Sequence, residues 1–288
     1  MERISALPDP IIREAVTRAL GEDIGPMDIT SHHFVPSKTQ AQATMLARQE
    51  GVLAGLPLAI YAFRELDPQC RIETYLHDGQ LFSAGTVLLK IEGNARAILS
   101  AERTALNFVQ QLSGVATLTH RFVQATAGTA TQILDTRKTV PGLRLLQKYA
   151  VVCGGGKNHR MGLYDHFLIK DNHLTLLTTQ ELRDRIKAAR QAHPEATIEI
   201  EASSLEQVKT FSSLDVDVLL LDNMDLSTLA QALQIIGGRI KTEASGNMTL
   251  DRVAQIARLG VDYISVGALT HSAPAVDISL EFQVLGLD

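Results

Sequence analysis

The alternation of apolar and polar residues predicts the fold of the second half of the chain. Six short apolar segments each end in a charged, polar or glycine residue, and they cover residues 132–138, 166–172, 197–202, 217–223, 239–246 and 263–267. Helical patterns lie between the later segments, over residues 179–192, 205–212, 226–236 and 250–259. This alternation predicts parallel strands joined by right-handed helical crossovers.

Two architectures share this alternation, the doubly wound open sheet and the α/β barrel. The barrel is favoured because charged or small residues recur at every predicted carboxyl end of a strand: Lys138, Lys170, Glu201, Asp222, Ser245, Gly246 and Gly267. In a barrel all these ends meet at one rim, where active sites lie. In an open sheet only the strands at the switch point approach a ligand. A count of six strands instead of eight speaks against the barrel.

The first part of the chain has a different pattern. Helical spacing is found over residues 10–20, before Gly21, and over 57–66, and strand patterns over 40–53, 71–76 and 86–92. These elements predict a small mixed α+β domain. The loop EDIGPMDIT contains Asp23 and Asp28, which could bind a metal, although helix capping and turn formation are commoner uses of such residues.

Residues 95–112 have the apolar spacing of a helix, and one arginine interrupts its apolar residues. Arg103 is flanked by Leu99, Ala101 and Leu106. A single arginine on a helix is most often a surface charge whose aliphatic part covers apolar neighbours. A functional role for Arg103 is the alternative.

Composition limits the function classes. A chain of 288 residues with 45% hydrophobic and 20% charged residues is typical of a globular enzyme with one or two domains. A formal charge of −5 argues against a general nucleic-acid binder. Cys70 and Cys153 have no metal-site spacing. No signal pattern or membrane-length apolar stretch is present, so we expect a cytoplasmic protein.

Positive charge gathers in one segment, residues 135–173. It contains seven Lys or Arg and three Asp, a local charge of +4. The cations lie at the ends of apolar segments and around Gly154–Gly156, which favours a concave site for a polyanion over a basic surface helix. The three glycines could cradle a phosphate, or form a flexible loop that carries His159 and Arg160.

The predicted rim has a cationic and an acidic half. The cationic half consists of Arg137, Lys138, His159, Arg160 and Lys170. Glu201 and Asp222, on consecutive strands, form the acidic half, and carboxylates that face a polyphosphate are best explained as Mg²⁺ ligands, direct or through water. Pairing with the rim cations is the structural alternative, and a glycosidase acid/base pair would not need five cations. The turns 245–247 and 266–268 offer backbone N–H groups for a phosphate.

Several motifs together carry a resemblance to a known family. They are LGEDIGPMDIT, LSAERTALNFVQQLSGVAT, TRKTVPGLRLLQKYAVVCGGGKNHRMGLYDHFLIKDNH, IEIEASSLEQ, VLLLDNM, EASGNM and ISVGALTHS. They resemble the quinolinate phosphoribosyltransferases, which are type II phosphoribosyltransferases, and they span essentially the whole chain. The resemblance implies transfer of the phosphoribosyl group of 5-phosphoribosyl 1-pyrophosphate to quinolinate, with Mg²⁺ and with release of pyrophosphate and CO₂.

The resemblance also implies an architecture. It is an α/β protein with an N-terminal α+β open-sandwich domain, residues 1–113, joined by the C-terminal segment 272–288. An incomplete α/β barrel of about six strands, residues 114–271, carries the active site, which removes the objection raised by six strands. A homodimer with shared active sites is implied, with a larger assembly left open. Arg103, in the motif SAERT, matches the arginine that one subunit lends to the other.

By the same matching, each candidate residue receives a role. Lys138, Lys170, Glu201 and Asp222 resemble the catalytic positions, and the two carboxylates would hold Mg²⁺ with the pyrophosphate. Quinolinate would contact Arg103, Arg137, His159 and Arg160, while Lys138 and Lys170 serve the substrate anions. The remaining candidates would bind substrate, chiefly the 5-phosphate: Thr139, Ser245, Gly246, Asn247, Val266, Gly267, Ala268 and His271.

Two other functions compete with this one. A homologous phosphoribosyltransferase-like protein associated with molybdenum transport shares the barrel, but the motifs HFLIKDNH and SAERT favour the quinolinate enzyme. A non-catalytic anion-binding barrel would not need Glu201 and Asp222 opposite the cations.

Overall fold

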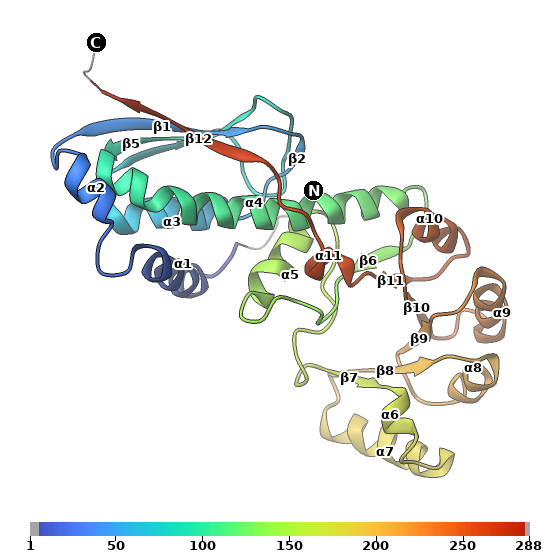
Figure 1. Cartoon of the computed structure of the whole chain (residues 1–288). Coiled ribbons are helices and arrows are strands. Elements are labelled where there is room, and N and C mark those ends of the chain that lie inside the picture. The colour runs from blue at the N-terminus through green and yellow to red at the C-terminus, as the bar shows by residue number, and fades with distance from the viewer. Residues whose placement is uncertain (1–5, 286–288) are drawn as a thin grey trace. The chain divides into compact units, whose positions relative to one another are not determined.

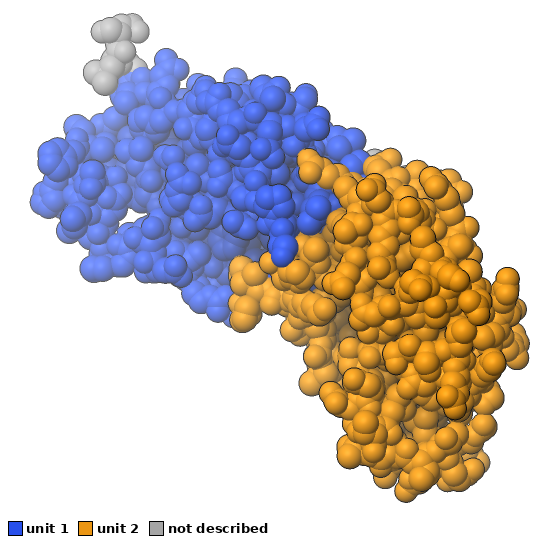
Figure 2. Space-filling model, turned by 45° about the vertical axis from the view of Figure 1, so that its right-hand side comes forward, with its two compact units in different colours: residues 1–120, 146–155, 272–288 blue, residues 121–145, 156–271 orange. Residues whose placement is uncertain are grey.

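A computed structural model describes residues 6–285 (Figure 1), which form two compact units. Of the described residues, unit 1 contains 6–120, Leu146–Gly155 and 272–285, and unit 2 contains Arg121–Leu145 and Gly156–His271 (Figure 2). The predicted division between residues 113 and 114 stays a prediction. Residues 1–5 and 286–288 of the predicted N-terminal domain lie outside the described residues.

Unit 1 contains a four-stranded antiparallel sheet in the order β12-β1-β5-β3. The strands are β1 (Gln40–Ala47), β3 (Arg71–Thr74), β5 (Val87–Asn94) and β12 (Ile278–Val284), and a small pair is formed by β2 (Gly51–Val52) and β4 (Leu81–Phe82). Alternate residues of β1 are buried, as expected for a sheet with one covered face. Figure 1 shows helices α3 (Leu56–Leu66) and α4 (Ala95–Ala125) along that sheet. The predicted α+β character of this region is confirmed.

Two predicted helix ends were wrong, and both errors involve glycine. Helix α1 (Asp9–Ile24) continues through Gly21 and ends at Gly25, whose φ of 57° suits a residue without Cβ. Helix α4 continues through Gly114, where a Cβ would collide with the backbone of Pro274. A glycine inside a helix costs about 1 kcal/mol relative to alanine, but here it permits close packing that no larger residue allows.

The acidic loop near the N-terminus begins a helix that the sequence pattern did not predict, α2 (Ile29–Phe34). Asp28 is its N-cap, because Asp28 Oδ1 accepts a hydrogen bond from the Ser31 N–H at 2.9 Å. Its other oxygen accepts a hydrogen bond from Ser100 Oγ at 2.8 Å. Asp23 lies within α1. The capping interpretation of Asp28 is therefore confirmed.

Unit 2 contains a six-stranded parallel sheet in the order β6-β11-β10-β9-β8-β7. The strands are β6 (Gln132–Leu134), β7 (His166–Ile169), β8 (Thr197–Ala202), β9 (Val218–Asp222), β10 (Lys241–Ser245) and β11 (Tyr263–Ser265), so each predicted segment contains one. Strands β7 to β11 follow in chain order, and β11 returns beside β6. This is the strand order of a barrel that lacks one pairing, between β6 and β7. The fold prediction of an incomplete barrel is confirmed.

Four of the six connecting helices of unit 2 begin where the local sequence provides a side-chain cap. They are α6 (Asp171–Leu174), α7 (Thr179–Ala192), α8 (Leu205–Phe211), α9 (Leu226–Ile236), α10 (Leu250–Arg258) and α11 (Ala268–His271). Side chains of Thr178, Ser204, Asp225 and Thr249 each accept a backbone N–H in the first turn of the helix that follows. Within residues 6–285, no helix combines the length and apolar character that crossing a bilayer requires.

The open edge of β6 is occupied by the segment that follows helix α5 (Arg144–Cys153). Lys157 N donates to Ile133 O at 2.8 Å, and Asp135 N donates to Lys157 O at 3.1 Å. The His159 N–H donates to Asp135 Oδ1 at 2.9 Å. These bonds hold the segment parallel to β6, and they bring the next residues, His159 and Arg160, to the carboxyl end of the sheet.

Candidate active site

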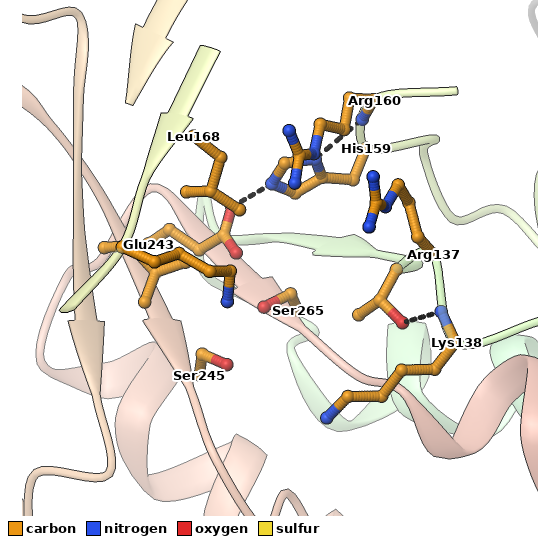
Figure 3. Close-up of a pocket in the computed structure, with 11 residues that line it drawn as sticks. Arg137, Lys138, His159, Arg160, Leu168, Glu243, Ser245 and Ser265 are labelled. Atoms are coloured by element: carbon orange, nitrogen blue, oxygen red, sulfur yellow. Dashed lines mark hydrogen bonds and ion pairs between the residues drawn. The ribbon is translucent and has the colours of Figure 1, made fainter. Parts of the chain in front are cut away.

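A pocket with a volume of about 230 Å³ lies at the carboxyl ends of the unit 2 strands (Figure 3). The structure brings six predicted site residues into its lining: Arg137, Lys138, His159, Arg160, Lys170 and Ser245. Five further lining residues were not predicted: Thr136, Leu168, Leu220, Glu243 and Ser265.

Arg137 and Arg160 concentrate positive charge at one side of this pocket (Figure 3). Burial lowers the pKa of Arg160 from its ordinary value, and repulsion from Arg137 lowers it further. The Arg160 side chain is oriented by a hydrogen bond from Nη1 to the backbone oxygen of His166 at 3.3 Å. Guanidinium groups close enough to repel each other are stabilised by an anion that binds both.

Lys138 lies beside the turn that follows β11. A Cβ on Gly267 would come within 3.1 Å of Lys138 Cδ and 3.3 Å of His271 Nε2, so these three predicted residues are neighbours. Thr270 Oγ1 donates to Lys138 O at 2.8 Å, which fixes the two loops to each other. The turn between them contains two more candidates, the buried Val266 and Ala268, the first residue of α11.

The ends of β9 and β10 are joined through asparagine. Asn223 Nδ2 donates to Asp222 Oδ2 at 2.8 Å, and Asn223 N donates to Ser245 O at 3.0 Å. Asn223 and Asn247 have φ angles of 53° and 44°, in the left-handed region. Gly246 has a φ of 100° and lies so close to the Asn223 side chain that a Cβ would not fit. This packing fixes the Asp222 carboxylate.

Glu201 is half-buried and pairs with a cation of the pocket. Lys170 Nζ lies 3.0 Å from Glu201 Oε2, and 46% of the lysine side chain is exposed. Pairs this exposed contribute little to stability, at most about 1 kcal/mol. Glu201 and Asp222 end the neighbouring strands β8 and β9. Hard oxygen ligands at neighbouring strand ends suit Mg²⁺, so the donor set fits the predicted ion.

Ten predicted site residues are not in the lining of the pocket: Arg103, Thr139, Glu201, Asp222, Gly246, Asn247, Val266, Gly267, Ala268 and His271. Eight of them lie at the ends of β8 and β9 or in the turns and helix that follow β10 and β11, and the other two are Thr139 and Arg103. Thr139 follows Lys138, and its hydroxyl accepts a hydrogen bond from Arg144 Nε at 3.1 Å. Arg103 is exposed on α4 in unit 1, and within residues 6–285 it takes part in no recorded ion pair. The roles of both residues stay predictions.

A buried group of four titratable side chains lies at the inner end of the pocket. Glu199 Oε2 lies 3.0 Å from His159 Nε2 and 3.1 Å from His166 Nε2, and Glu243 Oε2 lies 3.5 Å from His159 Nε2. We call these four side chains the buried acid cluster. Imidazoles and a carboxylate can bind transition metals, and here the groups contact one another directly.

The two acids of the cluster differ in their surroundings. Burial raises the pKa of Glu199, but contacts with His159 and His166 outweigh it and place the pKa below its ordinary value. Burial, followed by repulsion from Glu199, raises the pKa of Glu243 to about 8. The cluster therefore favours a charged Glu199 and a protonated Glu243.

His159 contributes to the pocket differently from the prediction of a simple anion contact. Its Nδ1 accepts the Arg160 N–H at 2.6 Å, and its Nε2 faces Glu199 and Glu243. Both ring nitrogens therefore have protein partners, and the His159 imidazole orients the backbone that carries Arg160. A direct contact of His159 with quinolinate stays a prediction.

Comparison with known families identifies the chain. The quinolinate phosphoribosyl transferase C-terminal domain matches residues 115–281, and the N-terminal domain of the same family matches residues 28–113. The chain belongs to the quinolinate phosphoribosyl transferase family.

Individual members of the family are similar over nearly the full length. The mitochondrial quinolinate phosphoribosyltransferase [decarboxylating] 2b of Nicotiana tabacum is 41% identical, over 96% of this chain and 83% of its own. The nicotinate-nucleotide pyrophosphorylase [carboxylating] of Mycobacterium leprae is 42% identical, over 93% of this chain and 96% of its own. The solved structure of NadC from Streptococcus pyogenes superposes with a TM-score of 0.92 at 36% identity, covering 98% and 99% of the two chains.

Sequence reasoning placed Glu201 in this family site but missed Glu199, Glu243, His166 and Ser265. One signal was available, because residues two apart on a strand point to the same face. Glu199 shares a face with Glu201 in TIEIEA, and Glu243 is a charge inside a strand that the sheet buries. A carboxylate within a buried strand of a barrel indicates an interior partner.

The three consecutive glycines have a packing role. A Cβ on Gly154 would collide with the backbone oxygen of Ala116 and with Thr119 on helix α4. Gly155 has a φ of 88°, which favours glycine. The first two glycines therefore permit the close approach and the turn after α5, and neither observation requires a bound phosphate.

Proposed function

We propose that the chain transfers the phosphoribosyl group of 5-phosphoribosyl 1-pyrophosphate to quinolinate, and that CO₂ and pyrophosphate are released to give nicotinate mononucleotide. One observation carries the proposal. A pocket lined by Arg137, Lys138, Arg160 and Lys170 lies at the rim of an incomplete barrel in a chain of this family. The names of the relatives favour this reaction over a molybdenum-associated function.

The cations solve the main electrostatic problem of the reaction. Quinolinate is a dianion and its co-substrate is a polyanion, so their approach is opposed unless positive groups neutralise both. In the proposed complex, Arg137 and Arg160 bind the quinolinate carboxylates through guanidinium pairs. Lys138 and Lys170 contact the anions that lie between the two substrates. His159 holds Arg160 in place through its ring nitrogen.

The opposite side of the pocket would hold the phosphoribosyl group. The 5-phosphate is proposed to bind the backbone N–H groups of the turns 245–247 and 266–268, with His271 beside them. Gly246 packs against the Asn223 side chain and Gly267 against the Lys138 and His271 side chains, so that a Cβ at either position would crowd these neighbours. Thr139, which follows Lys138 in the chain, is proposed to bind substrate as well.

Glu201 and Asp222 are the proposed Mg²⁺ ligands, directly or through water. When bound, the ion would neutralise the pyrophosphate leaving group. Asn223 fixes the Asp222 carboxylate, and Lys170 pairs with Glu201 until the substrate arrives. With the ribose and quinolinate positioned, the pyridine nitrogen forms its bond to the anomeric carbon as the bond to pyrophosphate breaks. The quaternary nitrogen then stabilises the electron pair left on the ring when CO₂ departs, and a proton from solvent adds to that carbon to give nicotinate mononucleotide.

We further propose a homodimer in which Arg103 of one subunit completes the site of the other, as the family resemblance implies. The exposure of Arg103 on helix α4, where a partner subunit could reach it, supports this proposal. Closed twofold symmetry would make the exchange mutual. We also propose a cytoplasmic location.

The test is direct. Purified protein is incubated with quinolinate, 5-phosphoribosyl 1-pyrophosphate and Mg²⁺, and nicotinate mononucleotide, pyrophosphate and CO₂ are measured. We expect equal amounts of the three products and no turnover in excess chelator. Asp222→Asn should lower kcat/KM by at least about a hundredfold, because metal charge stabilisation is worth several kcal/mol. Full activity in chelator would refute the metal role, and no product would refute the reaction.

A further inference from the structure

The two carboxylates of the buried acid cluster, Glu199 and Glu243, have no task in the reaction described so far. Only 1% of the Glu199 side chain and 2% of the Glu243 side chain are exposed, and both carboxylates face the His159 imidazole. Glu243 also lines the pocket, close to His159 and Ser265 (Figure 3). An acid at the inner end of a pocket for anions needs an explanation.

The arrangement requires that one proton stay in the cluster. The carboxyl groups of Glu199 and Glu243 both lie near His159 Nε2, so they are close to each other. Two neighbouring carboxyl groups in a buried site do not both ionise readily, because the two negative charges would repel. Glu199 contacts two imidazoles at 3.0 and 3.1 Å, while Glu243 has one at 3.5 Å. The negative charge therefore belongs on Glu199 and the proton on Glu243. The raised pKa of Glu243, about 8, agrees with this geometry.

Groups from several elements face Glu243. They are Glu199 from β8, His159 from the segment before β7 and Ser265 from β11, and the neighbouring residue on β9 is the apolar Leu220. The cations of the same pocket are Arg137, Lys138, Arg160 and Lys170. Glu199 and a bound dianion both disfavour a charge on Glu243, whereas the histidine and the cations favour it.

We propose that Glu243 is a further residue of the acceptor site, that it acts there as a neutral carboxylic acid, and that binding of the dianionic acceptor is coupled to retention or uptake of its proton. The inference rests on the proposed function, since the acceptor is quinolinate. An ionised Glu243 would repel quinolinate across the pocket. In its acid form Glu243 adds no negative charge, and its O–H can donate a hydrogen bond to a quinolinate carboxylate. An ionised Glu243 could only accept hydrogen bonds.

The coupling has a defined pH window. Quinolinate should raise the pKa of Glu243, so protons are taken up at pH values between its pKa in the free protein and in the complex. With the free value at about 8, roughly three-quarters of the molecules have an ionised Glu243 at pH 8.5, and only a few per cent at pH 6.5. We expect more protons to be taken up per quinolinate at pH 8.5 than at pH 6.5.

The experiment is calorimetry of quinolinate binding to the full-length protein in three buffers of different ionisation enthalpy, at pH 6.5, 7.5 and 8.5. The dependence of the observed heat on buffer enthalpy gives the number of protons taken up. Glu243→Gln keeps the shape and stays neutral, so it should bind quinolinate with no uptake at pH 8.5. Glu206→Gln, the same change at an exposed position of α8, is the matched control and should behave as the original protein.

Two results would overturn the inference. They are quinolinate binding at pH 8.5 without proton uptake, and unchanged uptake in Glu243→Gln. If that variant does not fold, Ser265→Ala provides a second route. The Ser265 hydroxyl lowers the pKa of Glu243, so its removal should move the midpoint of proton uptake to higher pH. A midpoint that does not move contradicts the assignment to Glu243. Absence of quinolinate binding at every pH would instead refute the proposed function on which the inference rests.

Discussion

The positive charges of Arg137 and Arg160 lie close enough to repel each other, so we expect these two residues to determine which acceptors the pocket binds. Quinolinate offers two carboxylates and nicotinate only one. A hydrogen bond to a charged group is worth about 1.5–3 kcal/mol, which corresponds to roughly a tenfold to hundredfold change for one lost contact. We expect kcat/KM for nicotinate to be lower than for quinolinate by at least about tenfold. Steady-state kinetics with both acceptors tests this, and comparable values would contradict the assignment of the two arginines.

Glu243 should also leave a signature in stability. Its pKa rises from 4.5 to about 8 on folding, so the folded protein binds more protons than the unfolded chain between these values. The free energy of unfolding contributed by this group therefore falls as pH increases through that window. Glu243→Gln removes the effect. The Tm of the variant relative to the original protein should be higher at pH 8 than at pH 5, measured by thermal unfolding. An equal difference at both values would argue that Glu243 is not protonated when folded.

At the scale of elements, local sequence largely determined where helices begin. Asp28 illustrates this, because its carboxylate caps α2 and also binds Ser100. Asp28→Ala should lower the free energy of unfolding by about 0.5–2 kcal/mol, as for other N-cap losses. Asp23 is exposed within α1 and caps no helix. Asp23→Ala removes the same charge as Asp28→Ala and should change the free energy of unfolding little.

The capping effect should depend on pH with a known sign. Hydrogen bonds from Ser31 and Ser100 lower the pKa of Asp28 below its ordinary value of 3.8. The stabilisation is therefore present above about pH 4 and is lost as pH falls through the folded pKa. Denaturant unfolding at pH 7 and pH 3 measures both effects. Equal destabilisation by Asp28→Ala and Asp23→Ala at pH 7 would show that the cap is unimportant.

Helix ends were predicted less well than helix starts, for a physical reason. An N-cap is a hydrogen bond between residues about three apart in the chain, so a short stretch of sequence is enough to predict it. Gly21 was expected to end α1 and does not, and α4 continues past its predicted end at residue 112 through Gly114, where Pro274 from the far end of the chain packs against the helix. No local pattern distinguishes a glycine that ends a helix from one that permits packing.

At the scale of the whole molecule, the proposed exchange of Arg103 between subunits is open to a complementation test. Arg103→Ala and Lys138→Ala should each be nearly inactive while remaining folded. In a mixed dimer, one of the two sites would combine an intact Arg103 with an intact Lys138, and activity should return in that site. Up to about a quarter of the original activity is expected, because at most half of the dimers are mixed and each has one intact site.

The complementation experiment uses differential tags to verify that mixed dimers form, and circular dichroism to verify folding of each variant. Mixing either variant with itself is the control. Mixed dimers without any recovered activity would show that Arg103 acts within its own chain. A monomer at assay concentration, measured by light scattering, would contradict the shared site altogether.

The sequence by itself determined the parts of this protein that depend on near neighbours. The β/α rhythm from residue 132 onward specified six strands, and residues at their carboxyl ends, such as Lys138 and Lys170, were correctly placed at one pocket. This succeeded because parallel strands in a barrel share one rim, so position along each strand is sufficient to bring their ends together.

Only the tertiary structure decided what lies inside that rim. Glu199, Glu243, His159 and His166 come from three strands and one segment far apart in sequence, and their contacts fix which acid is charged. The same is true of Lys157, which occupies the edge of β6 where a barrel strand is missing. Burial and charge pairing between distant residues determine pKa values and the shape of the site, and periodicity along the chain carries no information about either.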